Sequence, residues 1–171
     1  MINLLLDFDS GNISLPKENN EEEALLVLTR IVCGIVENAE VKKTYSDNEY
    51  TTFNIEKADP GIIIGKHGHT LDAIQYILNL IMNKKENNEK KRLYFVDIDG
   101  YRKRREESLT RYAYEKSEIV KRKREPIKLY FMNSIERRLI HMALKEEPDI
   151  VTFSEGKEPY RRIVISPKID E

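Results

Sequence analysis

The stretch that decides the fold is DPGIIIGKHGHTLDAIQYILNL, residues 59–80. Proline suits the first position of a helix, so Pro60 predicts a short helical turn, which stops at Gly65. Apolar residues then recur at helical spacing, which predicts a second helix. Two glycines, Gly65 and Gly68, therefore flank two basic side chains between two helices, although glycine weakens local structure. The buried face of the second helix is expected to carry Leu71, Ile74, Leu78 and Ile81.

The glycine spacing distinguishes three kinds of phosphate-binding loop. A P-loop, G-x-x-x-x-G-K-[ST], fits poorly because Gly61 and Gly65 are one residue too close and Lys66 is followed by His67, which has no hydroxyl. A dinucleotide fingerprint needs G-x-G-x-x-G after a strand, and the first glycine is missing here. The third kind, a G-x-x-G loop between two helices, is the signature of KH domains. An ordinary tight turn between helices is the competing interpretation.

A G-x-x-G loop suits the backbone of a single-stranded nucleic acid. Its glycines let the sugar-phosphate chain approach closely, and the helix that follows presents unpaired N–H groups and the positive end of its dipole. Basic side chains between the glycines are expected to point outward beside the phosphates, while the apolar turn at 62–64 lines a groove for unstacked bases. The residues expected to contact nucleic acid here are Ile64, Gly65, Lys66, His67 and Gly68.

The pattern around this loop predicts an α+β fold whose first half is a KH domain. Residues 21–39 have the apolar period of a helix, residues 41–57 are typical of a hairpin that turns at 46–48, and residues 92–99 are typical of a strand. The resulting order is helix, strand, strand, helix, helix, strand. This order resembles the bacterial type II KH arrangement, which we expect over residues 21–98.

The second half, residues 99–171, is expected to place helices on a small three-stranded sheet. A long basic helix begins near Tyr101 and ends before Pro126. A second helix begins at Asn133, which is spaced from Glu136 as in a capping box. Its inward face is predicted to carry Ile135, Leu139, Met142 and Ala143. The three strands are predicted at 127–131, 149–156 and 160–167.

Arg137 and His141 are four residues apart and are therefore neighbours on this second helix, on a face away from the predicted apolar stripe. Together with Arg138 they are expected to contact nucleic acid. R-x-x-x-H alone is a weak signal, and two solvated side chains are the competing interpretation. Its position after a long basic helix and a strand, and before TFSEGKEPYRRIVI, is similar to the small single-strand-binding domain named after the R-x-x-x-H motif.

The segments IGKHGHTLDAIQYILNLI, DIDGYRKRREESL, MNSIERRLIHMAL and VTFSEGKEPYRRIVI together resemble the bacterial Jag family (SpoIIIJ-associated proteins) over residues 21–167. The resemblance implies a cytoplasmic RNA-binding protein linked to cell elongation, division and envelope control. It also implies association with a small single-KH protein or with itself. The family usually carries a further small N-terminal domain, for which residues 1–20 are too short, so we expect a tail or linker remnant there. Many members have Arg where His67 stands, which predicts weaker phosphate binding by this loop.

The formal net charge of the 171-residue chain is only −1, but the charges are unevenly distributed. Residues 97–141 carry 13 Lys/Arg and 8 Asp/Glu, whereas residues 1–58 carry 5 and 11. Local patches decide nucleic-acid binding, so the basic middle favours single-stranded RNA, with single-stranded DNA as the alternative. The acidic first third keeps a second function open, a protein-interaction scaffold that dimerises through its KH module and binds nucleic acid only incidentally.

Several other classes of function find no support in the sequence. The three histidines lack the Cys/His spacing of a metal site, and neither a nucleophile elbow nor a catalytic carboxylate pair is recognisable. We therefore expect no metal, no cofactor and no enzymatic activity. No apolar run approaches the roughly 18 residues of a membrane span, and the first residues do not resemble a signal peptide. Cys33 lies in an apolar helical run and is expected to be a small buried residue.

Overall fold

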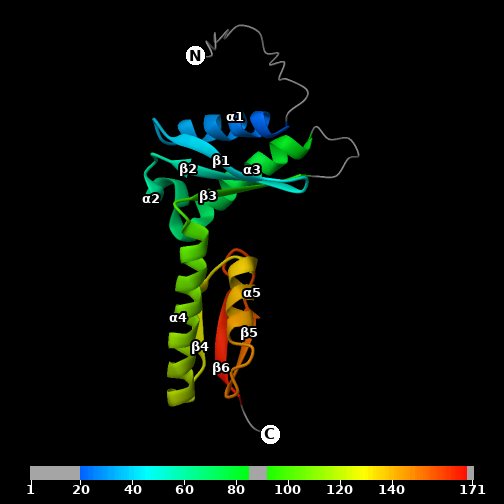
Figure 1. Ribbon diagram of the computed structural model, residues 1–171. Helices are drawn as coiled ribbons and strands as arrows, with labels where there is room; N and C mark the ends of the chain where they lie inside the picture. The colour runs from blue at the N-terminus through cyan, green and yellow to red at the C-terminus, as the bar shows by residue number, and fades with distance from the viewer. Residues whose placement is uncertain (1–19, 85–91, 169–171) are drawn as a thin grey trace, which may run out of the picture. The chain divides into compact units, whose positions relative to one another are not determined.

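The computed structural model describes residues 20–84 and 92–168, which leaves the predicted tail at 1–20 almost wholly outside the described residues. The chain divides after Asp99 into two compact units, each with its own sheet (Figure 1). The first unit contains α1 (Asn20–Cys33), β1 (Glu40–Ser46), β2 (Tyr50–Glu56), α2 (Pro60–Ile64), the 3₁₀ turn η1 (Lys66–Gly68), α3 (His69–Lys84) and β3 (Leu93–Ile98). The second unit contains α4 (Tyr101–Lys123), β4 (Ile127–Phe131), α5 (Ser134–Ala143), β5 (Ile150–Glu155) and β6 (Arg162–Pro167).

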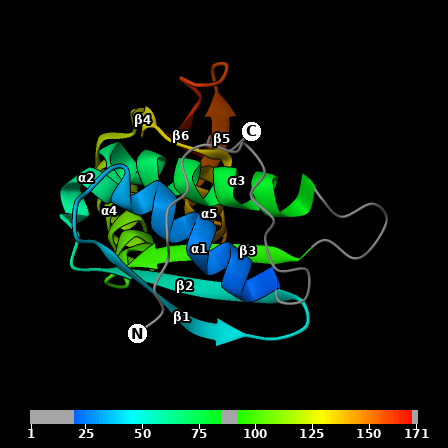
Figure 2. The same ribbon diagram turned by 90° about the horizontal axis from the view of Figure 1, so that it is seen from above.

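The sheet of the first unit has the order β1-β2-β3, antiparallel between β1 and β2 and parallel between β2 and β3. Alternate residues of β2, namely Thr51, Phe53 and Ile55, are buried on the face that α1 and α3 cover (Figure 2). The order of elements is the one predicted from the sequence. Along α3 the structure buries Met82 and exposes Ile81, so the predicted buried face was wrong at its last position. Both residues fit a 3.6-residue period after Leu78, and only packing distinguishes them.

Cys33 is exposed, which corrects the expectation that it is a small buried residue. It is the last residue of α1, and the chain leaves the helix at Gly34. The core-facing position of this last turn belongs to Val32, which is fully buried. The thiol of Cys33 lies 3.5 Å from the carbonyl oxygen of Ala39 and donates a weak hydrogen bond to it.

Amide side chains of α3 close the free edge of β3. Asn79 accepts a hydrogen bond from the Tyr94 N–H at 2.9 Å and donates one to the Tyr94 carbonyl at 2.7 Å. One turn earlier, Gln75 accepts from the Val96 N–H at 3.0 Å. An unpaired edge strand invites pairing with another chain, and these amides satisfy the edge from within the unit.

Asn79→Ala is expected to destabilise the first unit by about 1–3 kcal/mol, because both backbone groups of Tyr94 lose their partner in a part-buried position. Urea unfolding of the full chain, followed by circular dichroism, measures the change. Leu80→Ala is the matched control, since Leu80 is an exposed neighbour on the same helix and its truncation should change stability by no more than about 0.5 kcal/mol. Equal stability of the two variants would contradict the role assigned to Asn79.

A polar network joins the start of α1 to the hairpin and to the residue before β3. Arg92 donates to the Glu21 carboxylate at 2.7 Å, to the Ser46 hydroxyl at 2.5 Å and to the buried Thr51 hydroxyl at 3.0 Å. Hydrogen bonds from Lys43 and then from Ser46 hold the pKa of Glu21 below its usual value. The network therefore keeps this carboxylate charged and links segments that are far apart in the sequence.

The sheet of the second unit has the antiparallel order β4-β6-β5, and one of its faces packs against α4 and α5. The core between them contains Leu109, Ala113, Val120, Leu129, Met132, Ile140, Leu144, Ile150, Ile163 and Ile165. This arrangement of helices on a small three-stranded sheet is the predicted one. Within the two described ranges, no helix is both long enough and apolar enough to cross a membrane.

The inward face of α5 differs from the prediction. Ile135, predicted to face inward, is 79% exposed, and Met142 is also exposed, whereas Glu136 and Arg137 are buried. The helix packs through Ile140, with charged residues on the same side. Those charges are tolerated inside because each finds a partner from another segment, a condition that buried charges require. An apolar period read along one helix cannot reveal such partners.

Candidate nucleic-acid interface

The loop between α2 and α3 requires glycine at its first position. Gly65 has φ 66° and ψ −169°, a region of backbone conformation that is essentially restricted to glycine. A Cβ atom placed on Gly65 would lie 2.0 Å from the Thr70 hydroxyl oxygen and 2.9 Å from the Thr70 Cβ. Gly68, with φ 87°, also has a left-handed backbone and is buried. The two glycines therefore have a structural cause in the path of the chain.

The residues between these glycines turn the chain into α3. Lys66 is exposed, and His67 is partly buried with the left-handed backbone angles φ 57° and ψ 24°, uncommon for a residue other than glycine. The turn ends at His69, the first residue of α3. All five residues predicted from the G-x-x-G pattern, Ile64 to Gly68, thus lie in one continuous loop. This loop combines the positive end of a helix dipole with an exposed ammonium group, an arrangement that suits phosphate.

Asp59 fixes the approach to this loop. Its carboxylate accepts a hydrogen bond from the Gly61 N–H at 2.8 Å and thereby caps α2, whose first residue is Pro60. The Gly65 N–H then donates to the Gly61 carbonyl at 3.0 Å and ends the turn. The predicted helix start is therefore present, and it sets where the first glycine of the loop lies.

In the second unit, the structure separates the two residues that define R-x-x-x-H. Arg137 is only 7% exposed, which corrects the prediction that it projects away from the core. One of its terminal nitrogens donates to the Met132 carbonyl at 2.6 Å, and the other donates to the Glu158 carboxylate at 2.6 Å. Arg137 lies on the buried side of α5 together with Ile140, and these two bonds satisfy its charge there. Arg137 therefore ties α5 to the segment between β5 and β6.

Two of the predicted residues on α5 are exposed. Arg138 and His141 are three positions apart, hence near neighbours on the helix surface. His141 also contacts the sheet, because its Nδ1 lies 2.5 Å from the hydroxyl oxygen of Thr152 in β5. The guanidinium of Arg138 and the imidazole of His141 are both suited to contact phosphate or to stack on a base.

Sequence reasoning missed a buried ion pair between α4 and α5. The Asn133 side chain caps α5 by accepting from the Glu136 N–H at 2.9 Å, as the capping-box spacing predicts. The carboxylate of Glu136, however, turns inward and accepts from Arg105 Nε at 2.8 Å. Arg105 also lies over the ring of Tyr130, 5.8 Å from its centroid. No signal in the sequence could have found this pair, because Arg105 belongs to a basic run that predicts a solvated surface.

The charge of Arg105 is maintained inside the unit by its partner. Burial alone would lower the pKa of Arg105, but the hydrogen bond and charge of Glu136 outweigh burial and leave that pKa above its usual value. Arg105 is therefore held between two helices, and its charge is not presented to solvent with the rest of the basic run. The positive surface of α4 relies on the other cations of the helix.

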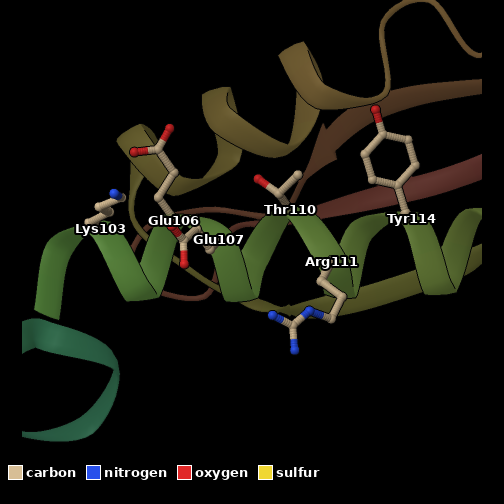
Figure 3. Close-up of a pocket in the computed structure, with 6 residues that line it drawn as sticks. All are labelled: Lys103, Glu106, Glu107, Thr110, Arg111 and Tyr114. Carbon is tan, nitrogen blue, oxygen red and sulfur yellow. The ribbon is translucent and has the colours of Figure 1, made fainter.

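A shallow depression of about 490 Å³ runs along the exposed side of α4 (Figure 3). Its lining consists of Lys103, Glu106, Glu107, Thr110, Arg111 and Tyr114. Two cations and two carboxylates balance each other here, so the depression does not favour an anionic ligand. The Tyr114 hydroxyl donates to the carbonyl of Ala143 at 2.8 Å and thereby holds the end of α5 against α4. We assign it no ligand.

Comparison with known families identifies both units. A family model described as "KhpA/KhpB, KH domain" matches residues 25–95, and the model of the R-x-x-x-H domain matches residues 107–167. The chain is therefore a KH module followed by an R-x-x-x-H module, as the sequence motifs predicted, within an α+β fold.

Curated relatives extend this match along the chain. Three relatives are each named RNA-binding protein KhpB. The Clostridium symbiosum protein is 35% identical over 153 residues, which is 89% of this chain and 68% of the relative. The Bacillus subtilis protein is 31% identical over 150 residues, 86% of this chain and 70% of the relative. The Lactiplantibacillus plantarum protein is 35% identical over 119 residues, 70% of this chain but 36% of that longer protein. The chain belongs to the KhpB family, for which Jag is a synonym, and the predicted family is confirmed.

Proposed function

We propose that this chain is a single-stranded RNA-binding regulatory protein that holds phosphates at the loop of residues 65–68. The geometry of that loop carries the proposal, because Gly65 leaves no room for a Cβ and brings the exposed Lys66 to the start of α3. The names of the curated relatives support RNA as the ligand class. A binding protein of this kind needs no catalytic group, cofactor or metal, and we propose none.

Arg138 and His141 form the second proposed contact, on the exposed side of α5. Arg137 was predicted to share in this contact, but its two terminal nitrogens bond to Met132 and Glu158 inside the unit. We therefore revise its role to positioning the segment that contains Glu158. The proposed contact then consists of one guanidinium and one imidazole, which suits phosphate binding or stacking.

The two roles on α5 predict opposite results for two variants. Arg138→Ala with His141→Ala should weaken binding to single-stranded RNA and leave the melting temperature close to that of the wild type, because both side chains are exposed. Arg137→Ala should lower the melting temperature by several degrees, because it leaves a buried carbonyl and a carboxylate without their donor. Fluorescence anisotropy with labelled RNA and a thermal melt measure the two effects. Normal RNA binding by the Arg138/His141 variant would refute this second contact.

The finer parts of the proposal need an experiment in cells. A cytoplasmic location, a preference for RNA over single-stranded DNA, and a role in cell elongation, division or envelope control follow from the family resemblance and remain predictions. Ultraviolet crosslinking in living cells, followed by sequencing of the bound RNA, tests the central part and names the targets. Recovery of discrete transcripts supports a regulatory RNA-binding protein, whereas recovery at the level of an uncrosslinked sample would contradict it.

An exposed apolar stripe on α3 favours a second candidate function. Tyr76, Ile77, Leu80 and Ile81 are large exposed side chains that recur at helical spacing on one side of this helix. Such a stripe suits association with another KH module, either a small single-KH protein or a second copy of this chain. Sedimentation equilibrium of the wild type and of Leu80→Asp tests self-association. A monomer in both cases, over the range of concentrations in the cell, would refute it.

A further inference from the structure

The sheet of the second unit has one face without a helix among the described residues. The core residues Ile163 and Ile165 of β6 point toward α4 and α5, so Val164 between them points to the opposite face. The register places Val164 between Lys128 of β4 and Phe153 of β5. Val164 is nevertheless only 2% exposed, so its neighbours on this open face cover it. The open face is therefore a packed surface built around a valine.

Aromatic rings are presented on and beside this open face. Phe131 of β4 lies opposite Arg162, two residues before Val164, and so belongs to the same face. The ring of Phe131 contacts the ring of Tyr160 edge to face, with centroids 5.6 Å apart and planes at 88°. Tyr160 is 64% exposed and Phe153 is 49% exposed. Rings held by a sheet but accessible to solvent are the usual platform for stacking unpaired bases.

The charge around these rings favours an anionic ligand. Both carboxylates of the segment from β5 to β6 are already paired, Glu155 with Lys128 at 2.7 Å and Glu158 with Arg137 at 2.6 Å. The same segment contributes Lys157, Arg161, Arg162 and, just after β6, Lys168. Within residues 20–84 and 92–168, the side chains of Arg161 and Arg162 form no ion pair. A partner that presents phosphates between flat apolar groups matches both features.

The loop between β5 and β6 is held in place by the arginine of the R-x-x-x-H motif. Arg137 bonds to Glu158 in this loop and to the carbonyl of Met132, and the Met132 N–H in turn donates to the Arg161 carbonyl at 3.3 Å. Tyr160 lies between the two tethered residues of the loop. The buried Arg137 thus fixes the loop that presents the most exposed ring beside the open face.

We propose that this open face is a further binding surface for single-stranded RNA, on which unpaired bases stack against Tyr160 and Phe153 while Arg161 and Arg162 pair with phosphates. It is distinct from the glycine loop and from the exposed residues of α5. The inference rests on the proposed function, because it assigns an additional surface to the same ligand. A protein partner would use the apolar area but would not require aromatic rings next to unpaired guanidinium groups.

Leucine replacements test whether the rings themselves are needed. Tyr160→Leu and Phe153→Leu keep an apolar side chain but remove the stacking surface, and each should weaken binding of the full chain to RNA roughly tenfold. Tyr160→Phe keeps the ring and should bind like the wild type. The probe is a short fluorescein-labelled single-stranded RNA of mixed sequence, followed by anisotropy. Ile135→Ala is the matched control, because Ile135 is an exposed apolar residue on α5, and it should leave the affinity unchanged.

The outcomes distinguish this surface from the function on which it rests. Leucine variants that bind RNA as tightly as the wild type would overturn the open face and leave the proposed function standing. Absence of RNA binding by the wild type would overturn both. If the leucine variants instead lose self-association in sedimentation runs and keep their RNA affinity, the face is a protein contact and the proposal is wrong. Thermal melts should show that all four variants fold like the wild type, since the replaced side chains are exposed.

Discussion

Glu136→Ala is expected to lower the free energy of unfolding of the second unit by about 3–5 kcal/mol, because it leaves Arg105 buried without its partner. A domain is typically stable by only about 5–15 kcal/mol, so this loss would leave the second unit close to unfolded. The first unit does not contain this pair and should stay folded. Urea unfolding should therefore separate into two transitions in this variant.

Two further variants show whether the lost ion pair is the cause. Glu107→Ala removes an exposed carboxylate from α4 and should change stability by about 0.5 kcal/mol or less. Arg105→Met with Glu136→Leu removes both charges together and should be much more stable than Glu136→Ala, because no unpaired charge remains. One nitrogen of Arg105 and one oxygen of Glu136 have no hydrogen-bond partner among the described residues, so apolar replacements give up little. If Glu136→Ala were as stable as Glu107→Ala, the pair would have no structural role.

Gly65→Ala is expected to damage both stability and RNA binding. The backbone angles of Gly65 cost another residue about 1–3 kcal/mol, and the new Cβ would also lie 2.0 Å from the Thr70 hydroxyl. The loop and the first turn of α3 must therefore move, which displaces Lys66 from the place where we propose that it meets phosphate. We expect a loss of roughly 2 kcal/mol or more in stability, together with weaker binding to single-stranded RNA.

Gly61→Ala provides the control for this loop. Gly61 lies in α2, and a Cβ there would meet only the Asp59 carboxylate, at 3.1 Å, a contact that a side chain relieves by a small shift. Its effect on stability should be well below that of Gly65→Ala. Denaturant unfolding and anisotropy should be measured on the same preparations. A Gly65→Ala chain that matches Gly61→Ala in both measurements would show that the loop tolerates a side chain.

The G-x-x-G loop was predictable from the sequence because each of its features has a local cause. Pro60 and Asp59 determine how α2 begins, and Gly65 and Gly68 are required by backbone angles that other residues rarely adopt. The order of helices and strands was predictable for the same reason, since periodicity and turn residues act over short distances.

The parts that could not be predicted depend on partners distant in sequence. Glu136 is buried because Arg105, 31 residues earlier, reaches it, and Arg137 is buried because Glu158, 21 residues later, does so. Without these partners an inward-facing Ile135 was the better prediction. The amides of α3 are a similar case, because Asn79 acts only once β3 lies beside the helix. The open face of the second sheet likewise became visible only when the strand register placed its rings together.

The central claim is that the loop of residues 65–68 holds RNA phosphates, and the affinity of Lys66→Asp with His67→Asp for single-stranded RNA tests it most directly. Lys84→Asp is the control, because it makes the same change in charge as Lys66→Asp at the other end of α3. We predict that the loop variant loses at least roughly tenfold in affinity with an unchanged thermal melt, because its carboxylates repel phosphate and occupy the helix start themselves. The control should lose little, and the wild type should weaken with salt at a logarithmic slope of about −0.7 per contacted phosphate. Unchanged affinity of a normally folded loop variant would contradict the account.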